Sequence, residues 1–196
     1  MLAKVNSSAV VGLNAVPVEV EIDIASQGLP SFTIVGLPDK AVEESKERVR
    51  SAIRNSEALF PKHKIIVNLA PADLPKEGPI FDLPIALGLL LGSGQIVNQS
   101  PSTINLDKTL VLGELSLDGT LRKSAGVLPL ALLAKQMGME SIIVPKENGR
   151  EAAIIEGIKV FAPNSLQEII KAMLGQKDLE VVERVLLTSE EDLEYD

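Results

Sequence analysis

Apolar and polar residues alternate along the beginning of the chain, a pattern typical of β-strands with one buried face. Between residues 16 and 24 every second residue is valine or isoleucine, and three of the four residues between them are acidic. This alternation predicts a half-buried strand with an acidic outer face. A weaker pattern predicts a strand over residues 2–11, and a third strand is expected over 31–35. The short turns between these segments favour an antiparallel meander.

The next segment, residues 38–55, has the periodicity of a helix, because it places Val42, Val49 and Ile53 on one helical face. The β-branched run over 64–69 then predicts a central strand. The later patterns predict helices over 83–91 with Asp82 as its N-cap, over 127–137 and over about 165–175, strands over 109–117, 141–144 and 158–161, and a hairpin turn at 118–119. Together they predict an α+β (mixed α/β) domain over residues 1–175, in which a mixed sheet packs against helices.

The composition indicates the cellular compartment in which we expect the protein. The chain has 196 residues, no cysteine and no apolar N-terminal segment of the kind that directs secretion. Its longest apolar run, residues 83–91, is far shorter than the roughly 20 residues that a membrane span needs. We therefore expect a cytoplasmic protein without a membrane segment.

Charge is distributed unevenly along the chain. The formal net charge is −8, but residues 177–196 hold eight acidic and two basic residues and so carry −6 of it. The preceding part is close to neutral, with a net charge of −2. The acidic composition predicts a solvated linker over residues 176–196, leading from the domain towards a module that this chain does not contain.

Several loop sequences resemble a known family. They are Val-Gly-Leu-Pro at residues 35–38, Arg-Val-Arg-Ser-Ala-Ile at 48–53, Val-Asn-Leu-Ala-Pro-Ala-Asp-Leu-Pro-Lys-Glu-Gly at 67–78 and Phe-Asp-Leu-Pro-Ile at 81–85. These segments resemble the N-terminal domain of the ComM/YifB family of Mg-chelatase-like AAA+ proteins. The resemblance implies a Lon-protease-like fold, followed in the family by an AAA+ ATPase module that forms hexameric rings. It also implies a DNA helicase that promotes branch migration in natural transformation.

The same resemblance allows the protease chemistry to be tested. In Lon proteases a Pro-Lys-Asp-Gly-Pro loop leads directly into the serine nucleophile, whereas here the loop at residues 75–79 is followed by Ile80. The lysine that acts as general base in Lon corresponds to Leu128, and the nearby Lys123 is expected to point elsewhere. Residues 57–92 contain no serine, threonine or cysteine. Because amide hydrolysis needs an activated nucleophile, we expect no enzymatic activity from this chain, a pseudo-protease.

Cofactor motifs are also missing. A P-loop needs Gly-Lys followed by Ser or Thr, and none of the 14 glycines precedes a lysine. His63 is the single histidine, and the paired carboxylates have no convergent partner, so no metal site is expected. We therefore expect no cofactor in this chain, with ATP and magnesium bound only by the downstream module.

Basic residues provide candidate contacts to DNA or to a neighbouring subunit. Lys46, Arg50 and Arg54 recur every four residues and form one stripe on the predicted helix, which is either an ordinary solvated face or a phosphate-contacting one. The other candidates are Lys62, His63, Lys64, Lys76, Lys146 and Arg150. Because aromatic residues are few, and the phenylalanines are expected in the core or at hinges, backbone contacts are favoured over base recognition.

Two functions remain open on the sequence. The first is a non-catalytic scaffold domain of a hexameric AAA+ DNA helicase, which supports ring assembly and guides DNA. The alternative is a module that binds a peptide or protein in a degenerate protease cleft around residues 75–82.

Overall fold

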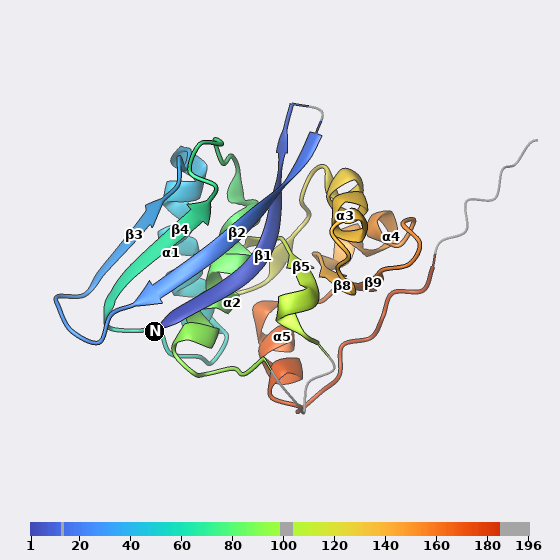
Figure 1. Cartoon of the computed structure of the whole chain (residues 1–196). Coiled ribbons are helices and arrows are strands. Elements are labelled where there is room, and N and C mark those ends of the chain that lie inside the picture. The colour runs from blue at the N-terminus through green and yellow to red at the C-terminus, as the bar shows by residue number, and fades with distance from the viewer. Residues whose placement is uncertain (13, 99–103, 185–196) are drawn as a thin grey trace, which may run out of the picture.

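A seven-stranded sheet organises the chain in the computed structural model, which describes residues 1–12, 14–98 and 104–184 (Figure 1). The strands run in the order β3-β4-β2-β1-β5-β8-β9, and four of the six neighbouring pairs are parallel. Their bounds are β1 Leu2–Val11, β2 Asn14–Ile24, β3 Ser31–Val35, β4 Lys64–Ala70, β5 Thr109–Val111, β8 Ser141–Ile143 and β9 Lys159–Phe161. A separate hairpin joins β6 (Glu114–Leu115) to β7 (Leu121–Arg122).

The helices complete the mixed α/β architecture. Their bounds are α1 Lys40–Asn55, α2 Asp82–Gly92, α3 Val127–Gln136, α4 Gly149–Ala152 and α5 Leu166–Met173, with 3-10 turns at Pro79–Phe81, Leu106–Lys108 and Lys146–Asn148. Helices α1 and α2 lie behind the strands β3, β4, β2 and β1 in Figure 1, and α3 and α4 lie beside β8 and β9. Within the described residues, no helix is long and apolar enough to cross a membrane.

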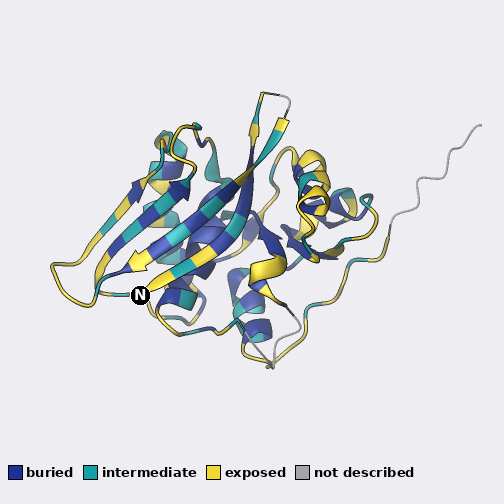
Figure 2. Cartoon of the chain, in the orientation of Figure 1, coloured by how far each residue is buried: buried dark blue, intermediate teal, exposed yellow. Residues whose placement is uncertain are grey.

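Helix α2 packs closely on the sheet because Gly88 leaves space for Ile22 of β2. A Cβ atom at Gly88 would lie 2.5 Å from Ile22 Cγ1, closer than real carbon contacts come. Nearly every side chain of α2 is buried, in agreement with the apolar run that predicted it. The opposite face of β1 and β2 carries polar side chains, including a Lys4–Glu19 ion pair of 2.7 Å. Buried residues alternate with more exposed ones along parts of both strands in Figure 2. The sheet therefore has one buried face and one solvated face in this region.

The first two strands, β1 and β2, pair in an antiparallel manner as the predicted meander requires. The meander is wrong for the third strand. Strand β3 does not pair with β2; it pairs in parallel with β4, which lies between them. Parallel neighbours need a long crossover connection, and α1 supplies it. The alternation of β3 identified a strand without revealing its partner, because pairing depends on the helix that follows.

Part of the expected acidic linker lies against the domain. The Val182 backbone N–H donates to the Val160 carbonyl over 2.8 Å, and Val181 forms an antiparallel bridge with Phe161. Leu179 also packs against the main core. This segment therefore covers the β9 edge of the sheet instead of extending into solvent, because its few apolar residues find partners there. Residues 185–196 of the expected linker lie outside the described residues.

Candidate functional site

A hollow of about 490 Å³ lies beside Ile80, which we call the Ile80 hollow. Its lining includes Val10 from the end of β1, Glu114 from β6, and Lys123 and Ser124 before α3. The loop that leads to Ile80 is fixed to α1, because the Gly78 N–H donates to Asp39 Oδ2 over 3.1 Å. The other oxygen of the same carboxylate accepts from Val42 N over 2.7 Å and caps α1.

The sequence correspondence and the three-dimensional arrangement differ in this hollow. Leu128 lies in the first turn of α3, is 37% exposed, and is not among the residues that line the hollow. Lys123 and Ser124, by contrast, both line it. Distance along the chain did not indicate that Lys123 and a serine line one hollow with Ile80, because the fold brings the segment before α3 next to the residue 75–79 loop.

Ser124 lacks the environment of an activated nucleophile. Its Oγ is shielded from solvent and has no hydrogen-bond partner among the described residues. A serine nucleophile needs a base within hydrogen-bonding distance to accept its proton. The backbone of Ser124 is held instead by Asn148, whose side-chain oxygen accepts from Ser124 N over 2.9 Å. Among the described residues, no base therefore accepts a hydrogen bond from Ser124 Oγ.

Asp82 does not cap α2 as predicted but lies wholly buried between α1 and α2. Arg48 Nε donates to one of its carboxylate oxygens over 2.7 Å, and the Ser45 hydroxyl donates to the other. The backbone N–H of Leu115 adds a contact of 3.1 Å. Burial raises the pKa of the Asp82 carboxyl, and the contacts with Arg48 and Ser45 partly counteract this rise. The sequence signal for this cluster was an aspartate next to a long apolar run, but its partners lie more than thirty residues away.

The basic stripe on α1 divides into paired and unpaired residues. Lys46 forms an ion pair of 2.6 Å with Glu43, and Arg50 forms one of 2.8 Å with Glu47. Arg54 forms no ion pair with any described residue. The solvated-face interpretation therefore describes Lys46 well, whereas Arg54 leaves its charge available to a ligand.

Four of the candidate residues meet in a second hollow, of about 230 Å³, which we call the Phe60 hollow. It is lined by Pro30, Ser31, Phe32, Arg50, Arg54, Phe60, Pro61, Lys62 and His63. The α1 helix, the beginning of β3 and the segment before β4 each contribute part of this lining. The spacing along the sequence did not predict this grouping, since it arises from the parallel pairing of β3 with β4.

Two phenylalanines expected in the core or at hinges are half-buried in this hollow. The ring centroids of Phe32 and Phe60 lie 5.7 Å apart with an interplanar angle of 41°, and the Arg50 guanidinium lies 5.2 Å from the centroid of Phe60. This distance is typical of a cation–π contact. The lining contains no acidic residue, whereas each of four other hollows formed by described residues has two or three.

The remaining candidates are scattered, and one is inaccessible. Lys76 is 0% exposed, and its ammonium donates to the Pro71 carbonyl, so the expectation that it contacts DNA is corrected. Burial also lowers the pKa of Lys76. Lys64 is exposed at the start of β4, outside the Phe60 hollow. Lys146 and Arg150 are exposed beside α4, in a hollow that they share with Glu180 and Glu183.

The comparisons with known proteins identify the family. A family model described as subunit ChlI of Mg-chelatase matches residues 18–148. The chain belongs to this family. It is 40% identical over 188 residues to "Competence protein ComM" of Haemophilus influenzae, which covers 96% of the chain and 36% of that relative. It is 44% identical over 179 residues to "Uncharacterized protein YifB" of Escherichia coli, which covers 91% and 34% respectively.

A more distant similarity agrees with the fold. "Lon protease 2" of Bacillus subtilis is 28% identical over 189 residues, which covers 87% of this chain and 32% of the protease. The expected Lon-protease-like fold with a mixed sheet and packed helices is therefore confirmed. The chain spans about a third of the length of the curated relatives it matches.

Proposed function

We propose that the chain is the non-catalytic N-terminal domain of a hexameric AAA+ DNA motor of the ComM type, which acts in branch migration during natural transformation or recombination. In this role the domain supports ring assembly and guides DNA. The 40% identity to a competence protein over nearly the whole chain supports this function. The similarity to a magnesium chelatase subunit supports an ATPase in the complete protein.

The observation that carries the proposal is a retained cavity without an activated nucleophile. Ile80 follows the residue 75–79 loop in the position where Lon proteases have serine, and the nearby Ser124 hydroxyl has no hydrogen-bond partner among the described residues to remove its proton. A fold that keeps a cavity but not its chemistry can still serve as a scaffold. ATP and magnesium belong, in this proposal, to a downstream module with its own P-loop, since no glycine here precedes a lysine. The proposed protein acts in the cytoplasm, where its DNA substrate lies.

The test uses the complete protein that contains this chain. We expect ATP-dependent unwinding of branched DNA, a hexameric mass by analytical ultracentrifugation, no casein cleavage, and no labelling of Ser124 by a serine-directed probe. A Ser124→Ala variant should unwind DNA at the parental rate. Proteolysis that disappears in Ser124→Ala would contradict the scaffold function.

A second function is a peptide-binding module that uses the Ile80 hollow. The observation in its favour is that Val10, which lines this hollow, is 43% exposed and offers an apolar surface to a peptide. Salt dependence separates the two functions, because DNA binding weakens steeply with salt whereas apolar peptide docking does not. A peptide whose binding is lost in Val10→Asp, and is insensitive to salt, would favour this second function.

A further inference from the structure

The Phe60 hollow combines positive charge with exposed donors. Arg54 and Lys62 are exposed, form no ion pair with any described residue, and share the lining with His63. No carboxylate lies in the lining, although the whole chain carries a formal net charge of −8. Separation of charge on this scale creates a local site for an anion on an acidic protein.

The aromatic rings restrict the kind of anion. Phe32 and Phe60 are half-buried beside the cations, and the Arg50 guanidinium covers part of the Phe60 ring. An anion held by charge alone gains nothing from such rings. A nucleotide unit uses both features, because its phosphate contacts the cations and its base stacks on an aromatic or guanidinium plane. In a duplex the bases are already stacked on one another, so only a single strand can use the whole hollow.

Hydrogen bonds hold the segments that line the hollow in place. The Leu59 backbone exchanges two hydrogen bonds of 2.7 Å with the Gln95 side chain, which fixes the segment carrying Phe60 and Lys62. Ser31 N donates to the His63 carbonyl over 3.3 Å and joins the beginning of β3 to the segment before β4. A preformed site loses little conformational entropy on binding.

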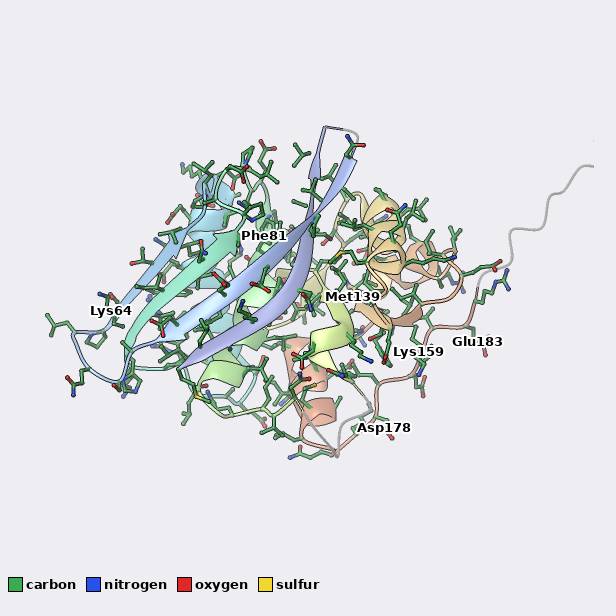
Figure 3. All side chains as sticks on the ribbon, in the orientation of Figure 1. Lys64, Phe81, Met139, Lys159, Asp178 and Glu183 are labelled. Carbon is green, nitrogen blue, oxygen red and sulfur yellow. The ribbon has the colours of Figure 1, made fainter. Side chains whose placement is uncertain are left out.

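The position of the hollow also favours a polyanion. The hollow lies at the β3 end of the sheet, beyond which no described residue forms a further strand, and the labelled Lys64 marks this region in Figure 3. Asp178 and Glu183, two acidic residues of the described part of the C-terminal segment, are labelled away from Lys64 in the same view. A strand bound at Arg54 and Lys62 therefore avoids these two carboxylates.

From this combination we infer that the Phe60 hollow binds single-stranded nucleic acid. Phosphates contact Arg54, Lys62 and His63, and one base stacks against Phe60 and Arg50. The inference rests on the proposed function, because it names the surface by which the domain guides DNA, and it commits to a single strand rather than a duplex.

The first experiment measures the affinity of the full chain for a fluorescently labelled thymidine oligonucleotide of about 16 nucleotides by anisotropy, at several salt concentrations. We expect the double variant Arg54→Ala with Lys62→Ala to bind at least about tenfold more weakly, with a salt slope smaller by about 1.4 for two lost phosphate contacts. The control is Lys146→Ala with Arg150→Ala, which removes the same charge from an equally exposed surface. Equal weakening by the control would overturn the inference, because it would mean that only net charge matters.

The second experiment tests stacking with Phe60→Leu, which keeps an apolar side chain and removes the aromatic face. We expect binding of the single strand to weaken about tenfold at an unchanged salt slope, and binding of a duplex of equal length to stay the same. Circular dichroism must give the parental spectrum for this variant. Unchanged single-strand affinity in the folded variant would contradict the site, and so would displacement of the oligonucleotide by polyglutamate of equal charge.

A third measurement separates this inference from the proposed function. If the complete protein shows no ATP-dependent unwinding while this chain binds single strands through the Phe60 hollow, the proposed function fails and the site stands. If the Arg54→Ala with Lys62→Ala variant binds single strands and unwinds branched DNA like the parent, the site fails and the motor stands.

Discussion

The Ile80 hollow and the Phe60 hollow lie in the same domain but have different relations to its fold. The Ile80 hollow follows from the Lon-like architecture, since the residue 75–79 loop leads into α2 at this point. Its lining nevertheless includes three acidic side chains and a serine, Ser124, whose hydroxyl has no hydrogen-bond partner among the described residues. The Phe60 hollow has four cationic or imidazole side chains and two rings without a carboxylate. The comparison teaches that two hollows of one fold offer different chemistry, because the side chains that line them decide what they can bind.

Helix α1 connects the two hollows. Its N-cap Asp39 lines the Ile80 hollow and binds the Gly78 backbone, while Arg54 in its last turn lines the Phe60 hollow. Between these ends, Arg48 and Ser45 bind the buried Asp82. The Asp82 cluster therefore fixes the position of α1 relative to both hollows.

The largest expected effect comes from breaking this connection with Arg48→Met. The substitution leaves the Asp82 carboxylate buried without its cation, and we expect the free energy of unfolding to fall by about 3 kcal/mol. Urea denaturation of the full chain measures the change. The matched control is Arg50→Met on the same helix. The ion-pair partner of Arg50, Glu47, is largely exposed, so losing this ion pair should lower the free energy of unfolding by no more than about 0.5 kcal/mol, in addition to the effect of the lost Phe60 contact.

The pH dependence of Arg48→Met sharpens this prediction. Without the guanidinium, nothing cationic counteracts the burial that raises the pKa of Asp82. A carboxyl whose folded-state pKa is raised favours the folded state below its ordinary pKa of about 3.9, and this contribution is lost as the pH rises through the raised value. The deficit of the variant should therefore grow from mildly acidic to neutral pH. A deficit that shrinks over this range would show that Asp82 does not carry the effect.

A smaller effect, on the affinity for a single-stranded oligonucleotide, is expected when residues of the basic stripe are substituted one at a time. Arg54→Ala should weaken binding of a single-stranded oligonucleotide severalfold, about 1 kcal/mol, because this side chain is free to contact phosphate. Lys46→Ala on the same helix should leave the affinity nearly unchanged, because Lys46 is engaged with Glu43 and lies outside the Phe60 hollow. Equal loss in both variants would restore the view of the stripe as one continuous phosphate-contacting face.

A comparable contrast involves Lys76, which belongs to the loop of the Ile80 hollow. Lys76→Met should keep the parental affinity for DNA, since no phosphate reaches a wholly buried ammonium. Because burial lowers its pKa, the unfolded chain binds more protons than the folded one as the pH approaches the ordinary lysine value of about 10.4. The parent should therefore gain stability relative to Lys76→Met as the pH rises in this window, which urea midpoints at alkaline pH will measure. If Lys76→Met instead gained stability relative to the parent as the pH rises, the lowered pKa of the buried Lys76 would be contradicted.

Local elements were predictable where each segment carried its own signal. The alternation over 16–24 gave β2, and Asp39 and Ser165 cap helices that begin within a few residues of the predicted starts. Pairing was not predictable in the same way, because the insertion of β4 between β2 and β3 depends on the path of α1. The short strands β8 and β9 were recognisable from their apolar residues, whereas the predicted strand over 109–117 is divided between β5 in the main sheet and β6 in the separate hairpin.

The candidate site was predictable only as a set of residue types. Spacing placed Arg50 and Arg54 on one face of a helix, but it gave no reason to join them to Lys62 or Phe60. The same limit affected Ser124, which lies far from Ile80 in sequence and beside it in the Ile80 hollow. Distances across the fold depend on strand order, and a periodic pattern contains no information about that order.

The smallest expected effect tests whether the Ile80 hollow has any remaining chemistry. The Ser124 hydroxyl is shielded and has no hydrogen-bond partner among the described residues, so Ser124→Ala removes a buried polar group whose burial is uncompensated. We expect the free energy of unfolding to stay within about 0.5 kcal/mol of the parent or to rise slightly, because the substitution breaks no hydrogen bond of the Ser124 hydroxyl. Ser45→Ala is the contrasting variant, since its hydroxyl binds Asp82, and it should destabilise the chain by about 1–3 kcal/mol. If Ser124→Ala proves as destabilising as Ser45→Ala, the Ser124 hydroxyl has a partner, and the Ile80 hollow retains more organised chemistry than its lining suggests.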